Sequence, residues 1–169
     1  MDERVPALPM TNADTLLEFT AALRTTLATR LSAIPAEQFD ATSPAWSGTL
    51  RWQVGHLVVT PRRLTFLLFN EPLGLPDDYN RWFAKDTSPA NWGNDPVPAA
   101  GQLLDEMVSD VREVVEQMRR RWDEPFPVPY TTSTGAVLRT PGESLWFSLV
   151  HDGIHLGLMR GSLRALCLL

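Results

Sequence analysis

The sequence predicts an all-α protein in which four amphipathic helices pack as a bundle. Four segments place apolar residues three or four positions apart, as one face of a helix requires. Three of these apolar stripes approach the 3.5-residue spacing that is typical of four-helix bundles. The chain has 169 residues and an apolar fraction of 44%, enough to bury one core. We therefore expect residues 1–169 to form a single domain.

The first helix is expected from about Asn12 to Ala33. Thr11 and Asp14 have the spacing of an N-terminal capping box. Pro35 ends the helix. Its apolar stripe consists of Leu16, Phe19, Leu23, Leu27, Leu31 and Ile34.

The second helix is expected from Ser47–Thr49 to about Phe69. Pro61 lies inside it and has no N–H to donate to the Leu57 carbonyl, so we expect an unpaired carbonyl and a kink just after His56. Its apolar stripe consists of Leu50, Val54, Leu57, Pro61, Leu64 and Leu68.

Two further helices are expected from about Pro98 to Trp122 and from Pro141 to the end of the chain. The last has the clearest start, because Thr140, Pro141 and Glu143 supply the N-cap, a first-turn proline and a capping-box acid. The apolar stripe of the last helix consists of Leu145, Leu149, Asp152, Leu156, Met159, Leu163 and Leu166.

Two connections are not expected to be mainly helical. Residues 71–97 hold four prolines around a short helix near Asp78–Lys85, and such a long connection is either functional or disordered. Trp82, Phe83 and Trp92 favour a packed connection. Residues 127–140 are β-prone on both sides of Ser133-Thr134-Gly135 and predict a short hairpin before the last helix.

Composition and charge exclude several classes of protein. With 15 basic and 20 acidic residues the net charge is −5, so we expect no nucleic-acid partner. No run of uncharged apolar residues is long enough to span a membrane. The amino terminus lacks the apolar core of a signal peptide, and the lone Cys167 cannot form an internal disulfide; both suit the cytoplasm. We expect Cys167 to be a buried, small apolar residue rather than a nucleophile.

All three histidines of the chain fall on helix flanks. His151 and His155 are four residues apart, which places both imidazoles on one helical face about 6 Å apart. At about 100° per residue, these two and His56 lie beside the apolar stripes of their helices, where bundles build metal sites. The alternative is that the histidines fill the groove and bond locally. A zinc protease is disfavoured, because Asp152 replaces the glutamate of H-E-x-x-H and lies on the core-facing stripe.

Several motifs together resemble the DinB/YfiT-like superfamily, in its DinB-like branch. They are Trp52, Gly55-His56-Leu57, Ser88-Pro89, Gly135, Thr140, His151 with His155 and Gly157, and then Arg160, Leu163 and Arg164.

The resemblance implies an up-down-down-up four-helix bundle. It also implies a divalent metal, nickel or zinc, bound by His56, His151 and His155, and a homodimer is expected by the same analogy. Characterised members include S-transferases and isomerases that use bacillithiol, mycothiol or glutathione. The last helix of the family often has Gln where this chain has Leu158, which weakens any inference about polar substrate contacts.

Three functions are compatible with these features. The first is a metalloenzyme whose open coordination position activates a small thiol or water for reaction with a small-molecule substrate. Trp82, Phe83 and Trp92 would then form an aromatic wall, or else only pack their connection onto the bundle. Arg160 would hold a carboxylate of the thiol cofactor, or else be a solvated surface residue. The second is a non-catalytic metal-binding or stress-response bundle, and the third is a purely structural role for the histidines.

Overall fold

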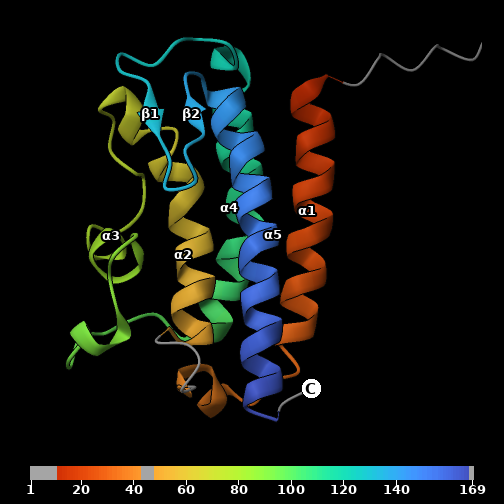
Figure 1. Cartoon of the computed structure of the whole chain (residues 1–169), viewed down its shortest axis with the longest axis vertical. Helices are drawn as coiled ribbons and strands as arrows, with labels where there is room; N and C mark the ends of the chain where they lie inside the picture. Colours follow the sequence, from red (N-terminus) through yellow and green to blue (C-terminus); the bar gives the residue numbers. More distant parts are fainter. Residues whose placement is uncertain (1–10, 43–47, 168–169) are drawn as a thin grey trace, which may run out of the picture.

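Four long helices lie side by side in the computed structural model, which describes residues 11–42 and 48–167 (Figure 1). They are α1 (Asn12–Leu31), α2 (Leu50–Arg63), α4 (Ala100–Met118) and α5 (Pro141–Ala165). α1 and α5 run in one direction, and α2 and α4 run in the other (Figure 1). The all-α bundle and its up-down-down-up order are therefore confirmed. Both α1 and α2 contact α4 and α5, so the histidine-bearing helices α2 and α5 are neighbours.

Side-chain caps fix the starts of α1 and α5. Thr11 accepts a hydrogen bond from the Asp14 N–H, and the Asp14 carboxylate accepts one from the Thr11 N–H at 3.0 Å, which confirms the capping box. At α5, Thr140 accepts from the Glu143 N–H, as expected. The Glu143 carboxylate, however, accepts from the Arg139 N–H at 2.6 Å, one residue earlier than a capping box requires.

α2 ends at Arg63, six residues before the expected end. The Thr65 N–H donates to Arg62, three residues back, and the Thr65 hydroxyl donates to the Pro61 carbonyl at 2.8 Å. The hydroxyl thus takes the place of the Thr65 N–H, which in a continuous α-helix would donate to Pro61, and a 3-10 helix, η2 (Leu67–Phe69), follows. α4 likewise gives way to a 3-10 turn, η4 (Arg119–Arg121), within the range expected for the third helix.

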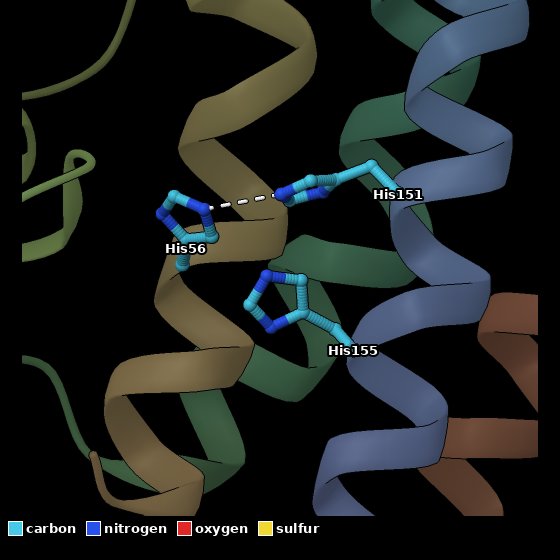
Figure 2. A group of neighbouring side chains, drawn as sticks. All are labelled: His56, His151 and His155. Carbon is cyan, nitrogen blue, oxygen red and sulfur yellow. Dashed lines mark hydrogen bonds between the residues drawn. The ribbon is translucent and has the colours of Figure 1, made fainter. Parts of the chain in front are cut away.

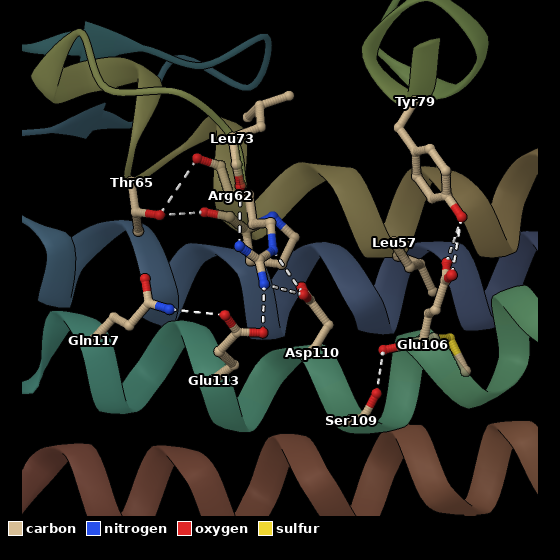
Figure 3. Close-up of polar contacts among 12 residues, drawn as sticks. Leu57, Arg62, Thr65, Leu73, Tyr79, Glu106, Ser109, Asp110, Glu113 and Gln117 are labelled. Atoms are coloured by element: carbon tan, nitrogen blue, oxygen red, sulfur yellow. Dashed lines mark hydrogen bonds and ion pairs between the residues drawn. The ribbon is translucent and has the colours of Figure 1, made fainter. Parts of the chain in front are cut away.

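The long connection between α2 and α4 is packed against the bundle. It contains the short helix α3 (Asp78–Phe83), where one was expected, and the 3-10 turn η3 (Pro89–Asn91). The Tyr79 hydroxyl donates to the Glu106 carboxylate of α4 at 2.9 Å (Figure 3). Buried Arg62 donates to Leu73 of the connection at 2.9 Å (Figure 3). The connection is thus held at both its beginning and its middle.

The expected hairpin is also present. β1 (Tyr130–Thr131) pairs antiparallel with β2 (Val137–Leu138), and Gly135 in the intervening turn has a φ of 84°. Glycine adopts this left-handed conformation without steric cost. The hairpin lies beside the ends of α2 and α5 that are uppermost in Figure 1.

A layer of buried polar side chains separates two apolar clusters of the core. One cluster includes Leu27, Leu57 and Met107, and the other includes Leu16, Val114 and Leu145. The polar side chains between them along α1, α4 and α5 include Thr20, Arg24, Asp110 and Asp152.

The buried face of α1 differs from the apolar stripe expected for the first helix, because it includes Arg24. Phe19, assigned to the apolar stripe, is 52% exposed, whereas Arg24 is 0% exposed. The Arg24 guanidinium donates to Asp152 at 2.6 and 3.0 Å, so the buried charges neutralise each other. It also donates to the Leu57 carbonyl at 2.9 Å, the carbonyl that Pro61 leaves unpaired. Asp152 does face the core, as its spacing predicted.

The prediction that Cys167 is buried was wrong. α5 ends at Ala165, and Cys167, with a φ of 57°, lies in the following turn with its side chain exposed. Because the turn follows the end of the helix, Cys167 is not part of the apolar face of α5. Separately, no helix of the described ranges is long and apolar enough to cross a membrane.

Candidate metal centre

The three histidines meet between α2 and α5. His56 extends from α2 towards His151 and His155, which lie one turn apart on α5 (Figure 2). One ring nitrogen from each lies within 4.8 Å of the others, and the Nε2 atoms of His56 and His151 are 3.3 Å apart. The helix flanks predicted that the three histidines line the groove between helices, and the family resemblance implied that they form one ligand set.

The surroundings of His56 fix its orientation. Its Nδ1 lies 2.7 Å from the Phe83 carbonyl, which can only accept, so Nδ1 carries the proton and Nε2 carries a lone pair. Trp52 stacks on the ring with centroids 4.7 Å apart and planes inclined by 11°. The Thr60 hydroxyl lies 3.4 Å from Nε2 and donates to the His56 carbonyl at 2.7 Å.

Gly55 allows the Phe83 carbonyl to approach His56. A Cβ atom at position 55 would lie 2.3 Å from the Phe83 ring, far inside van der Waals contact. The ring is 0% exposed and has no free space into which to move. Gly55 therefore leaves room for the Phe83 ring, and the Phe83 carbonyl in turn orients His56.

Burial keeps the imidazoles neutral. Desolvation lowers the pKa of His56, that of His151 to about 3 and that of His155 to about 4; neighbouring histidines add to the last two shifts. Each ring therefore offers a lone pair at neutral pH, the state that a metal ligand needs. The Nδ1 atoms of His151 and His155 are buried and accept or donate no hydrogen bond within the described ranges.

This donor set fits a divalent metal ion. Two imidazole nitrogens bound to one tetrahedral zinc ion at about 2.0–2.1 Å lie about 3.4 Å apart. His56 and His151 already have this spacing, at 3.3 Å. Without an ion, the same contact is a hydrogen bond in which the His151 Nε2–H donates to the His56 Nε2 lone pair. Three protein ligands also leave one coordination position open, as in catalytic rather than structural sites.

Two cavities adjoin the histidines. The larger, about 470 Å³, is lined by all three histidines, by Arg63 and Lys85, and by residues of the hairpin. The smaller, about 300 Å³, lies on the Trp52 side and is lined by His56, His155 and Leu158. A ligand of modest size therefore has access to the ring nitrogens.

The structure places the other candidate residues away from the cavities. Trp82, Phe83 and Trp92 are buried in the core and pack the connection onto the bundle. Only Phe83 reaches the site, through its carbonyl. Arg160 is exposed and lies about 140° around α5 from His155, so it points away from the ring nitrogens. The structure thus brings the histidines together without these four side chains.

Sequence reasoning missed the charged residues around the site. Arg24 could have been found, because it lies seven residues after Leu17 and seven before Leu31, on the buried face of α1. No comparable signal singles out Arg63 and Lys85, because their positions depend on how α3 and the hairpin fold over α2.

Comparison with known proteins agrees with this geometry. Among curated proteins, no sequence matches the chain closely enough to be called a relative. The family model described as the DinB superfamily matches residues 18–159, which include all three histidines. The chain therefore belongs to the DinB superfamily.

Proposed function

We propose that His56, His151 and His155 bind one divalent metal ion, nickel or zinc, and that the protein is a metalloenzyme acting on a small thiol or water. The observation that carries the proposal is the convergence of three neutral imidazoles at the wall of a cavity of about 470 Å³. Three nitrogen ligands suit both metals. The reaction proposed is that of a thiol S-transferase: the thiol loses its proton, its sulfur forms a C–S bond with an electrophilic carbon, and the leaving group of the electrophile, such as chloride, departs.

The chain's own residues prepare the site for this chemistry. The Phe83 carbonyl holds the His56 proton on Nδ1 and keeps Nε2 available. Trp52 covers one face of His56 and excludes water from it. A bound ion would supply a Lewis acid that lowers the pKa of a thiol or of water. The cavity leaves room for the second reactant beside the histidines.

Metal content per chain tests the site. The protein would be purified without a tag or added metal and analysed by elemental analysis, alongside His56→Ala, His151→Ala and, as the control, the surface variant Asp78→Asn. We expect about one equivalent in the native chain and in the control, and loss of metal in both histidine variants with unchanged helix content. Unchanged metal affinity in the histidine variants would contradict the assignment.

Turnover separates the enzyme from the non-catalytic alternative. Metal-loaded protein would be mixed with glutathione, bacillithiol or mycothiol and an electrophile such as 1-chloro-2,4-dinitrobenzene, and product formation followed by absorbance. The proposal requires a metal-dependent rate that His56→Ala abolishes. One equivalent of metal without such a rate, across thiols and electrophiles, would favour the non-catalytic metal-binding role.

We also propose the homodimer that the family resemblance implies. Trp146, Val150 and Ile154 repeat every four residues on α5 and are 37%, 61% and 46% exposed, an apolar row that a second copy would cover. Light scattering after gel filtration should give twice the mass of 18.9 kDa. Val150→Glu should shift the protein towards the monomer, and a native monomer at high concentration would rule the dimer out.

A further inference from the structure

We infer that the larger cavity beside the histidines binds a small organic carboxylate, and that Arg63 is the residue that holds the carboxylate group. This inference rests on the proposed function, because it names the chemical class of ligand for the same site.

Arg63 carries a positive charge that no carboxylate neutralises in the part of the chain that the structure describes. It is the last residue of α2 and is half-buried at the cavity wall. Its guanidinium donates to the side-chain carbonyl of Asn80 on α3. A neutral amide orients the guanidinium without cancelling its charge, and the fork keeps further N–H groups for a ligand.

Every other arginine that the structure describes either pairs with a carboxylate or is exposed. The arginines at positions 24, 62, 81, 119 and 121 each pair with at least one carboxylate, in distinct parts of the structure. The neighbouring Arg62, for example, pairs with Asp110 and Glu113. Arg63 differs from the unpaired arginines because it is half-buried at a cavity and oriented by Asn80. A guanidinium can bind a carboxylate through two parallel N–H groups.

A second cation lies on the same wall. Lys85 is exposed, and its nearest acidic partner, the adjacent Asp86, is 3.8 Å away with 84% of its side chain exposed. Such an exposed pair contributes little and leaves the lysine available. The side of the cavity formed by α2 and its connection is thus positive, with Asp86 as the one carboxylate that lines it.

The rest of the lining is polar but uncharged, or apolar. Thr132, Ser133 and Thr134 of the hairpin present hydroxyl groups, and Leu64, Phe147 and Ile154 present apolar surface. A ligand with one anionic group and a short apolar body matches this lining. A cationic ligand would meet two like charges.

The test compares 3-phenylpropanoate with 3-phenylpropanamide, which have the same shape but differ in charge. Each would be titrated by calorimetry into the full-length protein as purified, and its metal content measured. We expect the native protein to bind the carboxylate at least about fivefold more tightly than the amide, as a charge-assisted bond predicts. In Arg63→Gln the ratio should fall to about one, whereas Arg63→Lys should retain part of it.

Arg160→Gln is the matched control. Arg160 is the other arginine that the sequence offered as a carboxylate-binding residue, and Arg160→Gln also removes one positive charge. Because Arg160 is exposed and lies away from the cavity, the ratio should stay at the native value. Equal or undetectable binding of the two probes to the native protein, or a ratio unchanged in Arg63→Gln, would overturn the inference. Absence of metal from all samples with the ratio intact would instead count against the proposed metal centre alone.

Discussion

The buried pair formed by Arg24 and Asp152 offers the sharpest test of how the bundle supports its site. Their side chains are 0% and 2% exposed, and two hydrogen bonds of 2.6 and 3.0 Å join them. Asp152→Asn keeps the shape of the side chain but removes its charge, which leaves the guanidinium uncompensated in the core. Asp152 directly follows His151, so this pair also fixes the position of a proposed ligand.

The magnitude follows from burial. Removing one partner of a fully buried ion pair costs about 3–5 kcal/mol, whereas exposed pairs contribute about 0–1 kcal/mol. For a chain of this length, each kcal/mol lowers the melting temperature by about 2–4 °C, so we expect a decrease of about 6–20 °C. The double variant Arg24→Met/Asp152→Asn should recover part of the loss. Its remaining deficit, about 1–3 kcal/mol, comes from the Leu57 carbonyl and from the buried amide at position 152, which both lack the hydrogen bonds that Arg24 made.

Urea and thermal unfolding, followed by circular dichroism, would measure these differences. Asp78→Asn is the control, because Asp78 pairs with Arg81 at the surface, where both side chains are about half exposed. A loss below about 1 kcal/mol in Asp152→Asn, or a double variant less stable than the single one, would refute the reasoning.

Three further predictions concern the site itself. Gly55→Ala should cost about 1–3 kcal/mol of stability and weaken metal binding about 10–100-fold, because the Phe83 ring must move and with it the carbonyl that orients His56. Urea unfolding would measure the loss of stability, and metal competition would measure the loss of affinity. A variant with native stability and native affinity would contradict the clash. Nickel should quench tryptophan fluorescence in the native protein and distinctly less in Trp52→Phe, since Trp52 stacks on a proposed ligand; equal quenching in both would exclude this geometry. The free energy of unfolding of the metal-free protein should fall as the pH is lowered from about 6.5 to 4. In this range the unfolded chain binds protons at His151 and His155, whereas in the folded protein their pKa values of about 3 and 4 keep both imidazoles neutral. A free energy of unfolding that does not change with pH would contradict the burial of these histidines.

Much of the fold could be predicted because its signals are local. The four-helix pattern, the caps at Thr11 and Thr140 and the hairpin around Gly135 depend on residues within a few positions of one another. The end of α2 was misplaced by six residues, because the Thr65 hydroxyl competes for a backbone carbonyl. The spacing of apolar residues in the sequence gives no sign of that competition.

The site divides in the same way. The sequence determined which histidines exist, and helical geometry placed them on flanks facing a groove. It also determined that Pro61 would leave the Leu57 carbonyl unpaired. These conclusions need only the covalent chain and the regular geometry of a helix.

Only the tertiary structure decided what those groups meet. It brought Arg24 to the orphaned carbonyl, the Phe83 carbonyl to His56, and Arg63 to the cavity wall. Arg24 and the Leu57 carbonyl are 33 positions apart and lie on different helices, and so do His56 and the Phe83 carbonyl, which are 27 positions apart. Such contacts depend on how whole helices and connections pack, because burial and charge compensation are properties of the assembled core and not of any one segment.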